Sequence, residues 1–353
     1  MTTPRLHHFD ILKGLAIFMV VMGHVLTMCI REIDSAVLFK YVERIHMPIF
    51  FFISGYFSFK LTEVGSIAMP KLVMRAKQLL LPFFVVSTLW IYYFPHSGLQ
   101  SPLSSTWAGL YTDVWKNGYW FTLCLFEVIA LYASITPILT SCKTFLSRVM
   151  VVVISWLMLW QLTYSLIPTS ISNLLSLPLV FEFYPVFMFG VLARSEKERF
   201  DEVVSSSSWV TATLLVGSVL MYYACWSWEF SFPIECLYVA KEILYLCVVV
   251  VAFSVVKTWS AASYTLVRPH GGLLARMWEY LGNHSLAIYL LHYFFLFPMG
   301  AVRTALVGMN LGIVPTMVVA GITAAAVIAV VLGANCVISR SKILTLLLTG
   351  SLK

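Results

Sequence analysis

Long, uninterrupted apolar stretches recur along this chain and limit what it can fold into. Residues 149–167, VMVVVISWLMLWQLTYSLI, carry no charge at all. Over all 353 residues, 60% are hydrophobic and 11% are charged, whereas soluble domains are roughly a quarter charged. So few charges cannot cover a water-facing surface. We therefore predict a polytopic membrane protein, and the same figures exclude disordered, collagen-like and disulfide-rich secreted chains.

The apolar stretches are long enough to cross a bilayer, which takes about 20 helical residues. They are continuous rather than alternating, which excludes a membrane β-barrel, and backbone polar groups in lipid then require helices. We expect an all-α bundle that forms a single domain over 1–353, with no appended soluble domain. Its ten predicted spans are 11–30, 46–60, 78–95, 119–139, 149–167, 178–193, 208–226, 236–256, 279–300 and 311–338.

The basic residues predict the orientation of these spans. With a cytoplasmic N-terminus, seventeen of the 23 lysines and arginines lie on the cytoplasmic side, five lie on the other side and Lys241 lies within a span. Cytoplasmic loops carry such an excess, so both termini are predicted to be cytoplasmic. This excess of basic residues on the loops explains the net charge of +7. The positive charge is therefore no evidence for nucleic-acid binding, and we expect no nucleic-acid partner.

Asp10, Lys13 and His24 make the first span unusually polar. An ionisable side chain in a bilayer costs several kcal/mol, so each one is a functional hypothesis. Lys13 and His24 are separated by eleven positions, which is within about 20° of three helical turns and places both on one face, roughly 16 Å apart along the axis. The structural alternative makes Lys13 an interfacial anchor and His24 a buried histidine bonded to a carbonyl group.

Other polar residues at or within the predicted spans form a second group of candidates. The structural alternatives are topology determination for the basic residues of the loop before the third span, an interfacial position for His46 and an aromatic belt for Trp120. For the ionisable residues of the later spans they are mutual pairing across the bundle or lining of a wet cavity. No residue spacing resembles a metal site, and the HExxH, GxSxG, Walker and dinucleotide-binding patterns are absent, so we expect no metal. The candidates are His46, Ser54, Arg75, Lys77, Trp120, Glu127, Glu182, Lys241, Glu242, His284 and His292.

Four motifs, in this order, make the chain resemble the membrane acyltransferase-3 family, in particular its fucose 4-O-acetylase-like branch. The resemblance extends from residue 10 to about residue 300. The motifs are Asp10-x-x-Lys13-Gly14 with His24, His46-Met47-Pro48 continuing to Ser54-Gly55-Tyr56, Trp120-Phe121, and Leu281-Gly282-Asn283-His284-Ser285-Leu286 with Ile288-Tyr289-Leu290-Leu291-His292.

The sequence departs from the family pattern at two places. Lys13 stands where many members have arginine, and the cytoplasmic Arg-x-x-Arg of many members appears as Arg75-Ala76-Lys77-Gln78. The appended esterase-like domain of some members is not expected here.

The resemblance implies transfer of an acyl group, usually acetyl, from cytoplasmic acetyl-CoA to a hydroxyl of a sugar, glycan or lipid-linked sugar. It implies a multi-pass protein of a bacterial cytoplasmic (inner) membrane. His24 is the expected general base, with Lys13 and Asp10 as its catalytic companions on the same helix. Lys13, Arg75 and Lys77 are expected to contact CoA. Residues expected to bind or support the substrate are His46, Ser54, Trp120, Glu127, Asn283, Ser285 and His292.

Two questions stay open at this level. Direct transfer and an acyl-histidine intermediate both fit the residues. A proton-coupled transporter or flippase of a solute or lipid-linked glycan is the alternative function, because charged spans and midplane histidines suit a carrier as well.

Overall fold

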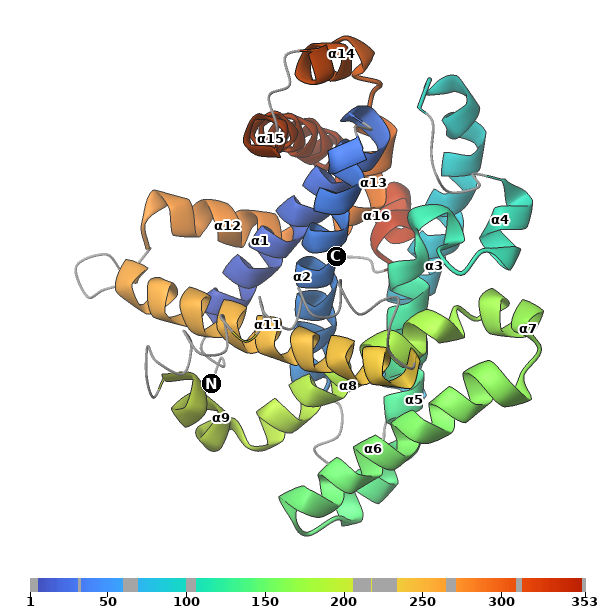
Figure 1. Cartoon of the computed structure of the whole chain (residues 1–353), viewed down its shortest axis with the longest axis vertical. Coiled ribbons are helices and arrows are strands. Elements are labelled where there is room, and N and C mark those ends of the chain that lie inside the picture. The colour runs from blue at the N-terminus through green and yellow to red at the C-terminus, as the bar shows by residue number, and fades with distance from the viewer. Residues whose placement is uncertain are drawn as a thin grey trace. The chain divides into compact units, whose positions relative to one another are not determined.

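Every regular element that the computed structural model describes is helical, as predicted (Figure 1). The structure describes residues 6–30, 33–59, 69–99, 106–205, 217, 234–264, 271–308 and 313–350. Its longer helices are α1 (His7–His24), α2 (Ile33–Ser58), α3 (Met69–Tyr93), α5 (Trp120–Ser141), α6 (Phe145–Gln161), α8 (Leu177–Ser195), α11 (Ile234–Ser263), α12 (Leu273–Asn283) and α15 (Ile313–Ile338).

Shorter elements join and flank these helices. They are η1 (Val25–Ile30), η3 (Phe94–His96), α4 (Trp107–Thr112), η4 (Lys116–Gly118), η5 (Leu162–Leu166), α7 (Thr169–Leu174), α9 (Lys197–Ser205), α13 (Ser285–Leu291), η6 (His292–Phe295), α14 (Gly300–Gly308) and α16 (Lys342–Thr349).

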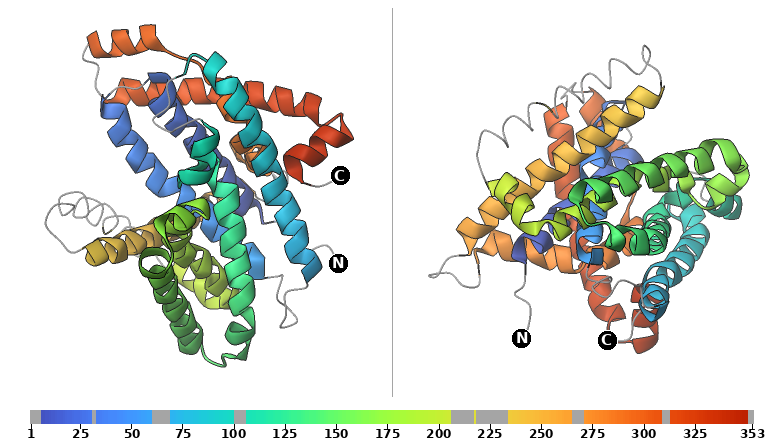
Figure 2. Two further views of the ribbon diagram at one scale, coloured as in Figure 1. Left: turned by 90° about the vertical axis from the view of Figure 1, so that its right-hand side faces the viewer. Right: turned by 90° about the horizontal axis from the view of Figure 1, so that it is seen from below.

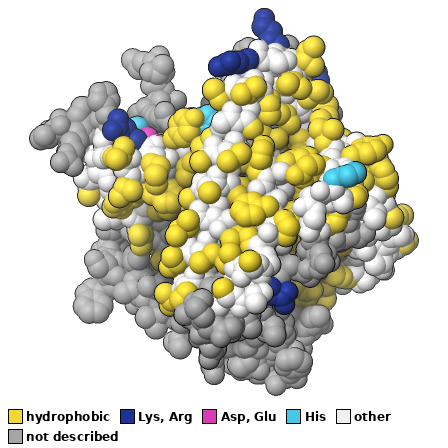
Figure 3. All heavy atoms as spheres, turned by 90° about the horizontal axis from the view of Figure 1, so that it is seen from above, with side chains coloured by type: hydrophobic (Ala, Val, Ile, Leu, Met, Phe, Trp, Pro, Cys, Tyr) yellow, Lys and Arg dark blue, Asp and Glu magenta, His cyan; other side chains and the backbone are white. Residues whose placement is uncertain are grey.

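Seven described helices are long and apolar enough to cross a membrane, and each matches one predicted span. They are His7–Ile30, Pro70–His96, Trp120–Ser141, Phe145–Leu166, Leu177–Ser195, Tyr238–Ser263 and Ile313–Ile338. Their outward surfaces suit lipid: on α6, Leu146 and Met158 are 70% and 67% exposed. On the face in Figure 3, apolar side chains are spread over the described surface and charged groups are few. The chain is therefore a polytopic helical membrane protein.

The remaining three predicted spans do not match a described membrane-spanning helix one to one. The predicted span 208–226 lies almost wholly outside the described residues. The predicted span 46–60 is the second half of α2, so the prediction that a helix starts at His46 is wrong; Pro48 lies within the helix. Membrane helices tolerate an interior proline because neighbouring groups satisfy the freed carbonyl.

The prediction of one continuous helix over 279–300 is also wrong. α12 ends at Asn283, and His284 leaves the helical conformation at φ −105° and ψ 9°. α13 follows at once, tightens into the 3₁₀ segment η6, and ends at the extended residue Leu296. Apolar composition continues through the break, so hydropathy alone does not reveal it.

The chain divides into two compact units. The first unit comprises Met1–Ala16, Arg44–Glu63 and Glu182–Asn283, and the second comprises Ile17–Glu43, Val64–Phe181 and His284–Lys353. In the first unit, the rings of Phe52, Phe200 and Phe253 pack on one another at 5.2–5.9 Å. In the second unit, α5 and α6 form an antiparallel hairpin (Figures 1 and 2), and α3 packs against α5.

Glycines let the helices of the first unit approach closely. A Cβ on Gly14 of α1 would overlap the carbonyl of Trp278 on α12, and one on Gly282 would overlap the carbonyl of Asp10. α2 and α8 cross in the same reciprocal way through Gly55 and Gly190. Small residues at helix crossings are typical of membrane bundles, because packing rather than the hydrophobic effect holds the helices together there.

Candidate active site

His24 lies where the first helix changes its winding. The α-helical part of the first span ends at His24, and the next six residues, Val25–Ile30, form a π-helix. The Thr27 hydroxyl donates to the carbonyl of Gly23 at 3.1 Å. π segments often occur at functional sites. The half-buried His24 therefore lies at the transition from α-helix to π-helix, which the sequence did not predict.

In the second unit, the His24 imidazole contacts two residues of η6. Its Nε2 lies 3.0 Å from the Tyr293 hydroxyl. The His292 ring lies 5.2 Å from the His24 ring and 4.2 Å from the Tyr293 ring, centroid to centroid. His292 is fully buried and Tyr293 is 1% exposed. The structure therefore brings together two of the predicted site residues and adds Tyr293, which the sequence analysis missed although it adjoins His292.

Aromatic and glycine residues hold Tyr293 in place. Its ring packs at 5.3 Å from Trp90 and 5.1 Å from Tyr119. A Cβ on Gly118, whose φ is +92°, would overlap the Tyr293 hydroxyl, so only glycine leaves room for this hydroxyl. The hydroxyl that meets His24 is thus fixed from several sides.

Tyr289, from the late motif, packs on the motif at the start of α5. Its hydroxyl accepts the Phe121 N–H at 3.2 Å and donates to the Gly118 carbonyl at 3.2 Å. The first N–H groups of a helix lack intrahelical partners, and here a side chain supplies one. Trp120 itself is buried and packs on Trp115 at 5.7 Å. Two of the four motifs that carried the family resemblance therefore contact each other directly.

Lys116 is a buried cation beside this region, in η4 just before the span. It is 1% exposed, and its ammonium donates to the carbonyls of Asp113 at 2.9 Å and Asn173 at 2.6 Å. Burial lowers the pKa of Lys116 from 10.5 to about 8, although the carboxylates of Glu127 and Asp113 oppose the shift. Glu127, a predicted site residue, thus has a cation near it, and one of its buried oxygens has no hydrogen-bond partner among the described residues.

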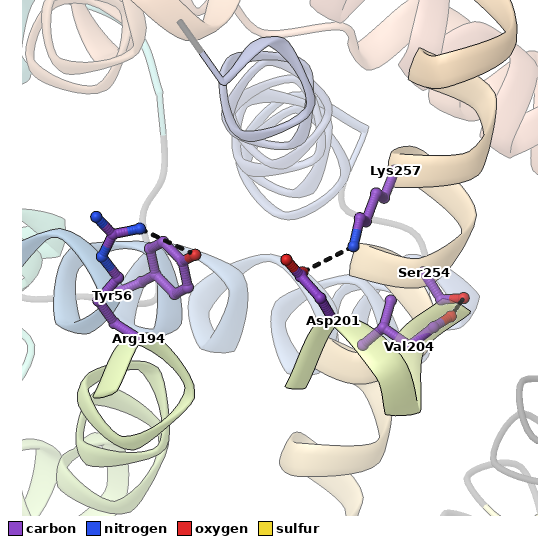
Figure 4. A network of polar contacts seen from close by, with 6 residues as sticks. All are labelled: Tyr56, Arg194, Asp201, Val204, Ser254 and Lys257. Carbon is purple, nitrogen blue, oxygen red and sulfur yellow. Dashed lines mark hydrogen bonds and ion pairs between the residues drawn. The ribbon is translucent and has the colours of Figure 1, made fainter. Parts of the chain in front are cut away.

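In the first unit, Asp10 binds the Lys13 ammonium at 2.7 Å, three residues further along the same helix. The same unit holds a second ion pair, Lys257 with Asp201 at 2.7 Å. Arg194 donates to the Tyr56 hydroxyl at 3.4 Å and lies over its ring (Figure 4). These contacts link α9 to α11 and α8 to α2 within the first unit.

A further ion pair joins α8 and α11 near their N-terminal ends, away from Arg194 and Lys257. Lys241 binds Glu182 at 2.6 Å, and the Tyr245 hydroxyl donates to the same carboxylate at 2.7 Å. This agrees with the structural alternative of pairing within the bundle. Glu242 beside it is 5% exposed, and neither of its oxygens has a hydrogen-bond partner among the described residues.

The other predicted residues are divided between the two units. In the first unit, His46 is buried, Ser54 is half-buried with its carbonyl bonded by Ser58 at 2.7 Å, and Asn283 is exposed. In the second unit, Ser285 is half-buried, and Arg75 donates to Gln78 at 3.2 Å, while Lys77 is exposed. No group of three metal-ligating side chains occurs among the described residues.

Comparison with known proteins places these motifs in a family. The model of an acyltransferase domain family, acyltransferase-3, matches residues 6–334. Nodulation protein NolL of Mesorhizobium japonicum is 28% identical over 239 residues, which are 65% of this chain and 58% of that protein, so the match spans less than two thirds of its length. No solved structure matches. The family model covers nearly the whole chain, and the chain therefore belongs to the acyltransferase-3 family.

Proposed function

We propose that this membrane acyltransferase moves an acyl group, acetyl in the first instance, from cytoplasmic acyl-CoA to a hydroxyl group of a sugar or glycan acceptor. One observation carries the proposal: the His24 imidazole is held by the Tyr293 hydroxyl at 3.0 Å, at the π-helical end of the first span. A hydroxyl group is a poor nucleophile at neutral pH, and a positioned imidazole is the side chain best suited to take its proton.

The proposed reaction needs one base and one proton path. The acceptor hydroxyl attacks the thioester carbonyl, and His24 takes the hydroxyl proton. The C–O bond forms, the C–S bond breaks, and His24 returns the proton to the CoA sulfur. In this scheme Nε2–H of His24 donates to the Tyr293 oxygen, which keeps the ring oriented and leaves Nδ1 with the lone pair that takes the proton. General-base catalysis of this kind contributes roughly 10²–10⁴ in rate.

Lys13, Arg75 and Lys77 are the proposed contacts for the phosphates or pantetheine of the donor. Lys13 lies eleven residues before His24 on α1, about 16 Å along the axis, so it does not serve the same oxyanion. Lys77 is exposed, and Arg75 lies two residues before it, near the same end of α3. Cationic side chains at a helix end suit phosphate groups. We place the donor side in the cytoplasm because the positive-inside rule places these residues there.

Thioester cleavage separates this function from a carrier. Protein purified in detergent is mixed with acetyl-CoA and cell-envelope glycans, and the free thiol of CoA is measured together with acetyl groups on the glycan. We expect both to appear in equal amounts. A carrier moves its solute without cleaving the donor, so acetyl-CoA that stays intact with every glycan fraction would refute the proposal.

A further inference from the structure

His292 is held in one tautomer by the backbone. Its Nδ1 lies 3.0 Å from the carbonyl oxygen of Ile288 and 2.7 Å from that of Tyr289. Carbonyl oxygens only accept hydrogen bonds, so Nδ1 must carry the proton. A neutral imidazole has one proton, which leaves Nε2 with a lone pair.

That lone pair has no hydrogen bond in the structure. His292 is fully buried, and its Nε2 has no hydrogen-bond partner among the described residues. A buried acceptor without a partner lowers stability, and most buried polar atoms therefore have one. Packing alone does not account for a histidine here, because a phenylalanine fills similar space without that cost.

The rings that surround His292 indicate which group its Nε2 lone pair can interact with. The His24 ring lies 5.2 Å away with the two ring planes at 31°, and the Tyr293 ring lies at 4.2 Å. Full burial keeps His292 from touching a substrate, whereas His24 is half-buried. In surroundings this apolar, a nearby lone pair interacts with a developing positive charge far more strongly than it does in water.

We infer that His292 is a positioning residue, whose Nε2 lone pair stabilises the imidazolium that forms when His24 takes the acceptor proton. This inference rests on the proposed function. His292 keeps its Nδ1 proton throughout, so it neither gains nor loses a proton. The only proton moved travels from the acceptor hydroxyl to His24 and then to the CoA sulfur.

Two substitutions at this position separate this role from a structural one. The amide nitrogen of asparagine can replace Nδ1–H, and the amide oxygen of glutamine can replace the lone pair of Nε2. If the lone pair assists His24, His292→Gln should keep kcat within about threefold of wild type, while His292→Asn should lose about tenfold or more, with the KM for acetyl-CoA unchanged in both. If the bonds to the carbonyls matter most, asparagine should be the active variant.

That reversed order would overturn the inference, and so would equal activities in the two variants. ¹⁵N NMR of histidine-labelled wild-type protein tests the same point without a substitution. We expect His292 to show a protonated Nδ1 and an unprotonated Nε2, and the opposite tautomer would also overturn the inference. A wild-type protein that never cleaves acetyl-CoA would instead refute the proposed function and leave the tautomer result standing.

Discussion

At the scale of single residues, the hydrogen bond between His24 and Tyr293 joins positions 269 residues apart in the sequence. Tyr293 is enclosed by Trp90, Tyr119 and Gly118, so its hydroxyl has little freedom to turn elsewhere. A hydrogen bond between neutral groups contributes about 0.5–1.5 kcal/mol. Orientation of the base should therefore matter measurably, though less than the base itself.

Tyr293→Phe should accordingly lower kcat about three- to tenfold and leave the KM for acetyl-CoA unchanged. The ring packing stays and only the hydroxyl that orients His24 is lost. Steady-state release of CoA measures the effect. Tyr111→Phe, at a tyrosine that is 49% exposed, is the control and should match wild type. A Tyr293→Phe enzyme with full kcat would show that the hydroxyl does not orient the base.

The lowered pKa of Lys116 predicts that the stability of the fold depends on pH. Because burial lowers its pKa from 10.5 to about 8, the unfolded chain binds more protons than the folded one between these two values. This group then makes the fold more stable as the pH rises from 8 to 10.5. Relative to Lys116→Met, the wild-type melting temperature should rise across that window. Lys143→Met, at an exposed lysine, is the charge-matched control, and a difference that stays constant with pH would contradict the prediction.

At the scale of elements, the apolar stretches predicted the seven helices that match, because length and hydropathy decide which segments cross a bilayer. The same signal does not show the π-helix after His24 or the break at His284, because the residues there remain apolar. The motifs at Lys13-Gly14 and Leu281-Gly282 were visible in the sequence, but their direct contact was not. The contact of Tyr293 with His24 could not be predicted either, because nothing in the sequence distinguishes this tyrosine from the other tyrosines among the 17.

The crossing of α1 and α12 gives a test at this scale. Gly14→Ala places a methyl group against the Trp278 carbonyl, and forced overpacking of this kind costs about 1–3 kcal/mol. We expect a lower melting temperature in detergent. Gly333→Ala on α15, where a Cβ meets nothing within 4 Å, should be neutral or slightly stabilising. Equal melting temperatures for both variants would contradict the close crossing.

At the scale of the whole molecule, the distribution of lysine and arginine predicts which side of the membrane each loop faces. Alkaline phosphatase is active only outside the cytoplasm, so a fusion after Gly98 should be active and one after Lys197 inactive. A green fluorescent protein fusion should give the opposite pattern. Active phosphatase after Lys197 would reverse the orientation and move the proposed donor site to the other side.

The central claim is that His24 is the base of an acyl transfer, and single-turnover transfer from acetyl-CoA tests it most directly. His24→Ala should lose roughly 10²–10⁴ in rate while it keeps its melting temperature and still binds acetyl-CoA. His96→Ala, at an exposed histidine whose ring bonds the Tyr92 carbonyl, should retain the wild-type rate. A folded His24→Ala protein that keeps more than about a tenth of the wild-type rate, a loss smaller than general-base catalysis supplies, would contradict the account.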